Sequence, residues 1–232
     1  MIVMAPWCNR IGGGGFHHRG RFHPISPNVP GFSMPLHGNA FQSQWQVTGQ
    51  THNQLQLDLI SSGPGNFSYH ATLMYELARG ELTVELGVTN TGTEAMPFGI
   101  GFHPWFQTNK QTRLAFHATR ELLNDDAGLP TQVGPAVDDF STPCRLPDGR
   151  IDNTFLDWTG TASLQHSGGT IEMRSTASML HVFSPCATAG FCCLEPQTAI
   201  PNAANFGGNP APILEAGELA TITMAISRKQ QS

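Results

Sequence analysis

Alternation of apolar and polar residues is the main pattern along this chain. Over residues 54–59 leucine alternates with glutamine or aspartate, and residues 82–88 repeat this period of two. The pattern predicts strands with one buried face. Residues 70–77 precede the second run, with the turn-forming residues 78–80 between them. We therefore expect these two segments to form a hairpin.

Short strand signals continue to the end of the chain. They fall at 162–166, 170–174, 179–184, 190–195 and 219–227. No window of a dozen residues carries a helical stripe of apolar positions. Many short strands separated by turns are typical of an antiparallel sandwich or barrel. The sequence contains neither an internal repeat nor a linker, so we expect residues 1–232 to form a single all-β domain.

Two stretches lack this alternation and are predicted to be loops. Residues 1–35 contain a run of four glycines and prolines at 24, 27, 30 and 35, although interleaved aromatic residues indicate that these loops are ordered. Residues 124–150 are rich in asparagine, aspartate, glycine and proline, the residues that favour turns.

Composition narrows the class of protein. Charged residues make up 12% of the chain, which also holds 25 glycines and 17 prolines, a balance that favours strands and turns over surface helices. The net charge is −5 and there are only two lysines, so we expect no nucleic-acid partner. We also expect no membrane partner, because no run is long and apolar enough to cross a bilayer. The first residues lack the basic and apolar regions of a signal peptide.

The cysteines indicate a reducing compartment. There are five, an odd number, and no repeated spacing suggests a disulfide framework. We interpret them as reduced thiols and expect the protein to be cytoplasmic. Cys192 and Cys193 are adjacent, so we expect them to point to opposite faces of one strand.

Residues 97–106 read Pro-Phe-Gly-Ile-Gly-Phe-His-Pro-Trp-Phe and carry the clearest candidate chemistry. Glycines in a strand-like run let another backbone or a ligand approach closely, and Pro104 biases His103 to an extended conformation. Aromatic rings beside a polar group suit a sugar, which stacks its C–H faces and hydrogen-bonds through its hydroxyls. A buried strand with a satisfied core histidine explains the same residues, and this stretch alone leaves both interpretations open.

Glu195 is a second candidate, because it follows four apolar or thiol residues. A carboxylate that leaves an apolar strand is costly unless it is paired or used. With only 12 lysines and arginines in the chain, a salt bridge is a weaker explanation than usual. His17, His18 and His23 cluster near the start, but no further ligand group stands at suitable spacing, so we expect no metal site.

Five polar segments occur along the chain. They are Asn9-Arg10-Ile11, Leu36-His37-Gly38 with Trp45 downstream, Gly101-Phe102-His103-Pro104-Trp105-Phe106, Ile151-Asp152 with Phe155, and Glu195-Pro196-Gln197-Thr198 followed by Pro201-Asn202-Ala203. Together, in this order, they resemble the aldose 1-epimerase (galactose mutarotase) family. Each motif alone is weak, whereas five in sequence are specific, and the resemblance covers essentially the whole chain.

The resemblance implies a large antiparallel β-sandwich, the galactose mutarotase-like supersandwich, with a sugar cleft on one sheet. It also implies interconversion of the α and β anomers of a free hexose without a cofactor. By position, Glu195 matches the base that removes the C1 hydroxyl proton, and His103 matches the acid that protonates the ring oxygen. His37 matches a second histidine that assists at that oxygen. Histidines and a partly buried carboxylate can exchange protons near neutral pH.

Four further positions match residues that bind the sugar, namely Arg10, Asp152, Trp105 and Asn39. Trp105 stands where many members have tyrosine, so an indole N–H replaces a hydroxyl. Only nine residues precede Arg10, where family members carry further strands. We expect a sandwich that lacks these strands and leaves an edge open, in a monomer or a homodimer.

Three alternative functions remain open from the sequence. A hexose 6-phosphate epimerase of the same fold would need cations, for which Arg10, Arg19 and Arg21 are candidates. A non-catalytic sugar-binding or sensing protein would need no acid–base set. A glycosidase would use Asp152 and Glu195, and it would cleave a chromogenic glycoside.

Overall fold

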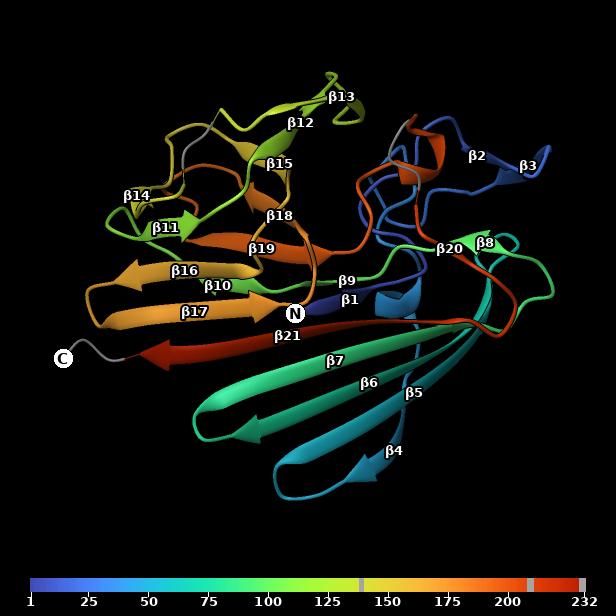
Figure 1. The fold of residues 1–232 in the computed structure, drawn as a ribbon, viewed down its shortest axis with the longest axis horizontal. Coiled ribbons are helices and arrows are strands. Elements are labelled where there is room, and N and C mark those ends of the chain that lie inside the picture. Colours follow the sequence, from blue (N-terminus) through green and yellow to red (C-terminus); the bar gives the residue numbers. More distant parts are fainter. Residues whose placement is uncertain (138–139, 208–210, 230–232) are drawn as a thin grey trace.

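The protein consists almost entirely of β-strands arranged in two large sheets (Figure 1). This computed structural model describes residues 1–137, 140–207 and 211–229. The eight-stranded sheet runs in the order β1 (Ile2–Met4), β9 (Gly101–His103), β19 (Phe191–Gln197), β18 (Met179–Ser184), β15 (Ile151–Leu156), β12 (Arg120–Asn124) and β13 (Pro130–Pro135), and β10 (Trp105–Gln107) also pairs with β19. The nine-stranded sheet runs β14 (Cys144–Arg145), β11 (Arg113–Phe116), β16 (Thr161–His166), β17 (Gly169–Ser175), β21 (Leu219–Lys229), β7 (Glu81–Asn90), β6 (Ser68–Ala78), β5 (Gln54–Ser62) and β4 (Gln46–Gln50).

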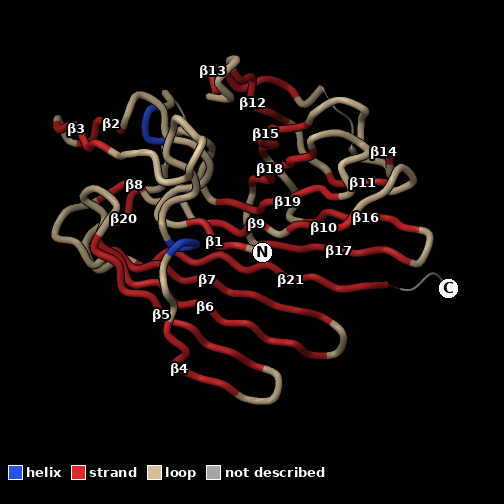
Figure 2. Tube along the Cα trace, turned by 180° about the vertical axis from the view of Figure 1, so that it is seen from behind, coloured by secondary structure: helices blue, strands red, loops and turns tan. Residues whose placement is uncertain are grey.

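Smaller elements lie among the loops at the strand ends (Figure 2). They are the hairpin of β2 (Gly15–His18) and β3 (Arg21–Pro24), the pair of β8 (Met96–Pro97) and β20 (Ile213–Leu214), and the 3-10 turns η1 (Ala40–Gln42) and η2 (Ala203–Asn205). None of the described helical segments has the length and apolar character to span a membrane. The large antiparallel β-sandwich predicted from the sequence is confirmed.

The predicted hairpin illustrates how local sequence builds the larger sheet. β6 and β7 pair antiparallel over their whole length, from Tyr69 opposite Asn90 to Ala78 opposite Glu81. The turn between them needs positive φ, which Gly80 supplies (78°). Because alternate residues face the same side, Leu73 of β6 and Val84, Leu86 and Val88 of β7 fall on the buried face, whereas Leu77 at the end of β6 is 61% exposed.

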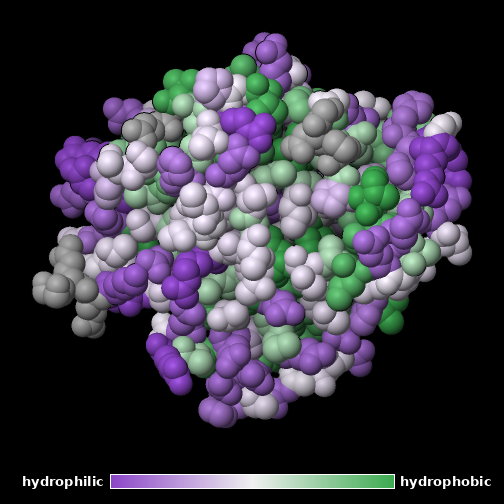
Figure 3. All heavy atoms as spheres, viewed as in Figure 1, coloured by the Kyte–Doolittle hydropathy of each residue, from purple (hydrophilic) through white to green (hydrophobic). Residues whose placement is uncertain are grey.

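One hydrophobic core lies between the two sheets. It takes Val84 and Leu86 from β7 and Met224 from β21, and from the other sheet Phe102 of β9 and Val182 of β18. All five side chains are essentially inaccessible to solvent. Burying each contributes about 1.5–3 kcal/mol relative to leaving it exposed. On the outer face seen in Figure 3, apolar side chains show as separate patches among polar ones.

The structure differs from the sequence prediction at the two stretches expected to be loops. Strands β1, β2 and β3 lie within residues 1–35, and β13 and β14 lie within residues 124–150. β13 begins and ends at prolines and pairs only with β12. Proline is tolerated in such an edge strand, since one side needs no ladder hydrogen bonds, so its sequence resembles that of a loop. The other four strands have only two to four residues, too few to show alternation.

The glycines of residues 97–106 do permit close approach of other segments. A Cβ on Gly99 would lie 2.8 Å from the Cβ of Ala199, and one on Gly101 would lie 2.8 Å from the carbonyl oxygen of Pro196. The backbone of Gly99 also donates a hydrogen bond to Pro6. These contacts bring the N-terminal segment, β9 and the end of β19 together beside His103.

Candidate active site

Four neighbouring strands of the eight-stranded sheet each place one polar residue at a common cleft. His103 ends β9, Glu195 lies on β19, His181 on β18 and Asp152 on β15. The register puts His181 directly opposite Glu195. Strand alternation turns these side chains away from the hydrophobic core, so the cleft lies on the opposite face of the sheet.

The cleft has a volume of about 170 Å³. Its lining residues are Asn9, Arg10, Phe32, Leu36, His37, His103, Arg150, Asp152, His181, Phe183 and Glu195. Several of them come from N-terminal loops rather than from the sheet. The sequence predictions Glu195, His103, His37, Arg10 and Asp152 are therefore brought together.

Two loop residues at the cleft, Asn9 and His37, adopt left-handed backbone conformations, with φ of 56° and 58°. The backbone N–H of His37 donates to the carbonyl of Asn9 (2.9 Å), and the backbone N–H of Asn9 donates to Nδ1 of His37 (3.2 Å). Non-glycine residues in this region are uncommon, and they concentrate at functional sites. The reciprocal hydrogen bonds hold the His37 ring in place.

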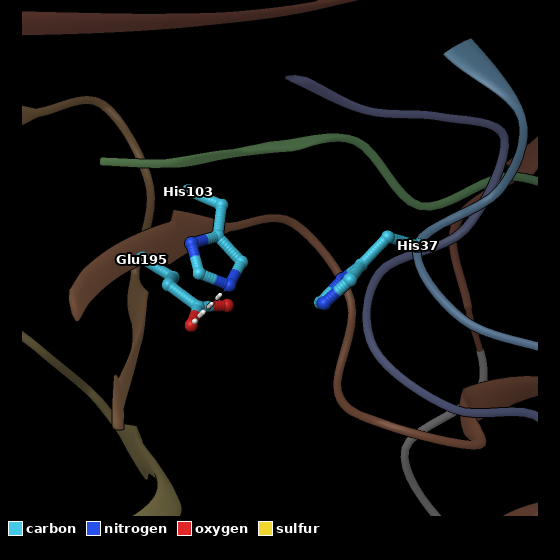
Figure 4. A group of neighbouring side chains, drawn as sticks. All are labelled: His37, His103 and Glu195. Atoms are coloured by element: carbon cyan, nitrogen blue, oxygen red, sulfur yellow. Dashed lines mark ion pairs between the residues drawn. The ribbon is translucent and has the colours of Figure 1, made fainter. Parts of the chain in front are cut away.

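Glu195 and His103 form the centre of the cleft. Glu195 Oε1 lies 3.2 Å from Nε2 of His103, and Figure 4 shows both groups directed toward the space that His37 also faces. Burial raises the pKa of Glu195 to about 7 and lowers the pKa of His103 to about 4. Both shifts disfavour charge, so near neutral pH this pair holds at most one exchangeable proton beyond the N–H of the neutral imidazole.

His37 presents a fixed N–H to the same space. Its Nδ1 accepts the backbone N–H of Asn9, so the proton of the neutral ring resides on Nε2. Burial lowers the pKa of His37 well below its ordinary value, which keeps the ring neutral. Its ring centroid lies 5.1 Å from that of His103, at a nearly perpendicular angle. His37 is thus arranged as a hydrogen-bond donor.

His37, His103 and Glu195 are also candidates for a metal site. Potential ligand atoms of His37, His103 and Glu195 lie within 4.8 Å of one another. However, the Nδ1 lone pair of His37 is already used, and its Nε2 carries the proton. A metal would need a free lone pair on one of these nitrogens. The donor set therefore fits a metal poorly.

Asp152 forms the other half of the cleft. Its Oδ1 lies 3.1 Å from Nε2 of His181, and its Oδ2 accepts from Arg10 (3.1 Å) and from Arg150. Burial alone would raise the pKa of Asp152, but the hydrogen bond from His181 and the charge of Arg10 outweigh burial and hold this pKa well below its usual value. Asp152 is therefore a charged acceptor across a wide pH range, unlike Glu195.

Two predicted sugar-binding residues lie outside the cleft lining. The Nδ2 of Asn39 donates to Ser61 of β5 (3.0 Å) and its Oδ1 accepts from the hydroxyl of Tyr69 of β6 (2.8 Å), so Asn39 fastens the start of η1 to these two strands. Trp105 is 47% exposed and stacks on His103, with ring centroids 4.1 Å apart. The stacking supports the orientation of His103, while contact of Trp105 with a sugar stays a prediction.

Sequence reasoning missed His181 as a site residue. It lies in the apolar run Met-Leu-His-Val-Phe of β18, where a histidine reads as a core residue. Only the pairing of β18 with β15 and β19 shows that it faces Asp152. Cys192 and Cys193 alternate as expected, because Cys192 belongs to the core cluster and Cys193 points to the cleft-side face, yet both are fully buried.

Comparison with known proteins agrees with this geometry. The family model for aldose 1-epimerase matches residues 2–227. The uncharacterized protein YphB of Escherichia coli K12 is 32% identical over 212 residues, which cover 86% of this chain and 73% of YphB. A solved Escherichia coli K12 protein, provisionally named an aldose 1-epimerase, superimposes with a TM-score of 0.91 at 29% identity and covers 99% of this chain and 83% of its own.

A more distant structure shares the fold. The galactose mutarotase-like protein of Clostridium acetobutylicum gives a TM-score of 0.86 at 18% identity, over 99% of this chain and 79% of that one. The family model, the relative from Escherichia coli and the arrangement of the sheets agree over nearly the whole length. This chain belongs to the aldose 1-epimerase family.

Proposed function

We propose that this protein is an aldose 1-epimerase that interconverts the α and β anomers of a free hexose. The observation that carries the proposal is the pairing of Glu195 with His103. A buried carboxylate whose pKa is raised to about 7 lies 3.2 Å from an imidazole, in a cleft that also presents hydroxyl-binding groups. Mutarotation needs one group that accepts a proton and one that donates a proton, and this pair supplies both.

The reaction follows from these positions. In the reactive form the one exchangeable proton of the pair has moved from Glu195 to His103, so ionised Glu195 removes the proton of the C1 hydroxyl while protonated His103 gives its proton to the ring oxygen. The C1–O bond of the ring breaks, and the electron pair of the former O–H bond forms the aldehyde C=O. After rotation about C1–C2, the ring oxygen attacks the other face of the aldehyde and both protons return.

The remaining groups bind and orient the sugar. His37 donates its Nε2–H toward the ring oxygen, which favours the charge that develops as the C–O bond breaks. Asp152 accepts from sugar hydroxyls and Arg10 donates to them, an arrangement that fixes the ring relative to Glu195. None of these roles requires a cofactor.

A free hexose is favoured over a phosphorylated one. Two of the candidate cations are engaged elsewhere, since Arg19 lies 3.4 Å from Glu215 and Arg21 lies 3.9 Å from Glu94. Neither is among the residues that line the described cleft. Arg10 and Arg150 both line the cleft, and both are already bonded to Asp152, so little uncommitted positive charge faces the substrate.

Polarimetry tests the proposal directly. Optical rotation of freshly dissolved α-D-glucose and α-D-galactose is followed near neutral pH with and without the protein. We expect faster relaxation, which is lost in His103→Asn, and no release of chromophore from a chromogenic glycoside. Relaxation at the spontaneous rate, together with sugar binding in calorimetry, would instead identify a sugar-binding protein.

A further inference from the structure

His181 is a buried histidine that the proposed reaction does not use. Its side chain is only 4% exposed, and it stands in the floor of the cleft, opposite Glu195 on one side and Thr154 on the other. A buried imidazole must satisfy both ring nitrogens or lose stability. Its partners therefore reveal what it does.

The contacts of His181 assign its proton. Nε2 lies 3.1 Å from the charged Oδ1 of Asp152, and Nδ1 lies 2.8 Å from Oγ1 of Thr154. If Nε2 carried a lone pair, that lone pair would face a carboxylate oxygen, which is repulsive. With the proton on Nε2, the ring donates to Asp152 and accepts the hydroxyl proton of Thr154, so every group is satisfied.

This tautomer also decides the role of Asn9. The Nδ2 of Asn9 lies 3.4 Å from Nε2 of His181, which cannot accept because it donates to Asp152. The Oδ1 of Asn9 meanwhile accepts from the backbone and the guanidinium of Arg10 (2.9 and 3.0 Å). Asn9 thus fixes Arg10, and His181 remains committed to Asp152.

The arrangement clamps the Asp152 carboxylate from both sides. His181 holds Oδ1, whereas Arg10 and Arg150 hold Oδ2. Without the His181 donor, the Asp152 carboxylate could rotate or bind a water molecule at Oδ1. Asp152 would then no longer point in a fixed direction as the acceptor of a sugar hydroxyl. A hydrogen bond to a charged group is typically worth about 10–100-fold in an equilibrium constant.

We propose that His181 is a positioning residue for the sugar: its Nε2–H donates to Asp152, its ring is held by Thr154 at Nδ1, and it thereby directs Asp152 toward a substrate hydroxyl. The inference rests on the proposed function in one respect only, that the ligand of this cleft is an aldohexose. It adds a third functional histidine, one that acts on binding rather than on proton transfer.

Substitutions at His181 separate positioning from packing. His181→Phe keeps a flat ring and removes the donor, while His181→Gln returns an N–H near the position of Nε2. We expect KM to rise at least about tenfold in His181→Phe with kcat within about threefold, and His181→Gln to recover most of the loss. Equal KM in wild type and His181→Phe would overturn the proposal, as would a fall in kcat alone.

Thr154 provides a matched pair that keeps the test valid even if His181→Phe fails to fold. Thr154→Val removes the hydroxyl with nearly unchanged shape, whereas Thr154→Ser keeps it. We expect KM to rise about threefold in Thr154→Val, about 0.6 kcal/mol of lost binding, and not in Thr154→Ser. A rise in both or in neither would contradict a role of this hydroxyl in holding the ring.

A double-mutant cycle shows whether His181 acts through Asp152. Calorimetry gives Kd for D-glucose and D-galactose in wild type, His181→Phe, Asp152→Asn and the double variant. We expect the His181 effect to vanish in the Asp152→Asn background, and additive effects would refute the proposal. Because Kd needs no turnover, an inactive wild type that binds sugar would refute the epimerase and leave this cycle decisive.

Discussion

Strands β18 and β19 show two different chemistries on their two faces. Toward the sandwich interior they present Leu180, Val182 and Leu194, which are buried in the main core. Toward the cleft, the neighbouring positions are His181 and Glu195, which are equally buried. The two sets of side chains differ in sequence position by only one residue. The apolar set packs the two sheets together, whereas the other set consists of titratable side chains that face the cleft.

The cleft face lowers the stability of the fold relative to the interior face. On the interior face of β18 the buried hydroxyl of Ser184 donates to the carbonyl of Cys186, whereas on the cleft face Glu195 Oε2 and His103 Nδ1 have no hydrogen-bond partner within the described part of the chain. Unpartnered buried polar atoms are uncommon in native proteins. Such atoms are tolerated where function needs them, and the interior face compensates for their cost.

The largest expected effect comes from removing the base on the cleft face. Glu195→Gln keeps the shape of the side chain but cannot take a proton, so we expect mutarotation to slow by about 10²–10⁴-fold. Sugar affinity in calorimetry should change by no more than a few-fold, because Asp152, Arg10 and His37 remain. Unchanged turnover in polarimetry would exclude Glu195 as the base.

The pH dependence of kcat/KM distinguishes the Glu195–His103 pair, which titrates near neutral pH, from Asp152, which stays charged over a wide pH range. The active form needs one proton on the pair, and the pair loses its last proton as pH rises through about 7, the raised pKa of Glu195. We therefore expect kcat/KM to fall above about pH 7, up to tenfold per pH unit. A kcat/KM that instead rises through pH 7 to a plateau would show that His103 carries no transferable proton.

A substitution on the interior face of the same strands should lower the free energy of unfolding and leave catalysis unchanged. Leu180→Ala leaves a cavity between the sheets, and we expect the free energy of unfolding to drop by about 2–5 kcal/mol. Denaturant titration measures the loss, and kcat of the folded protein should stay near the wild-type value. A large loss of kcat with normal folding would mean that the two faces are not independent.

The smallest effect concerns stability on the cleft face. Glu195 has a folded pKa of about 7 against an ordinary value of 4.5, so its contribution to stability is fully present below about pH 4.5 and is lost as pH rises through 7. Glu195→Gln lacks this loss, and its stability relative to wild type should improve by up to roughly 3 kcal/mol between pH 4.5 and 8. Thermal unfolding at both pH values checks this, and a pH-independent difference would contradict the raised pKa.

Local signals in the sequence predicted the strands and singled out His103 and Glu195, while the family resemblance supplied His37, Arg10 and Asp152 of the cleft. The alternation at 54–59 and 82–88 and the hairpin at 70–77 are confirmed, because a two-residue period already determines which side chains share a face. The order of the five motifs identified the family. Short strands in the first 35 residues escaped prediction, since three or four residues are too few to display a period.

What the sequence determined by itself was the pattern of burial, the family and the set of residues capable of acid–base chemistry. What only the tertiary structure decided was their partners. The pairing of β18 with β15 and β19 placed His181 on Asp152, and the left-handed loop at Asn9 fixed the proton of His37. A proton's position and a carboxylate's pKa depend on atoms within a few ångströms, and here these atoms come from segments more than 25 residues apart in the chain.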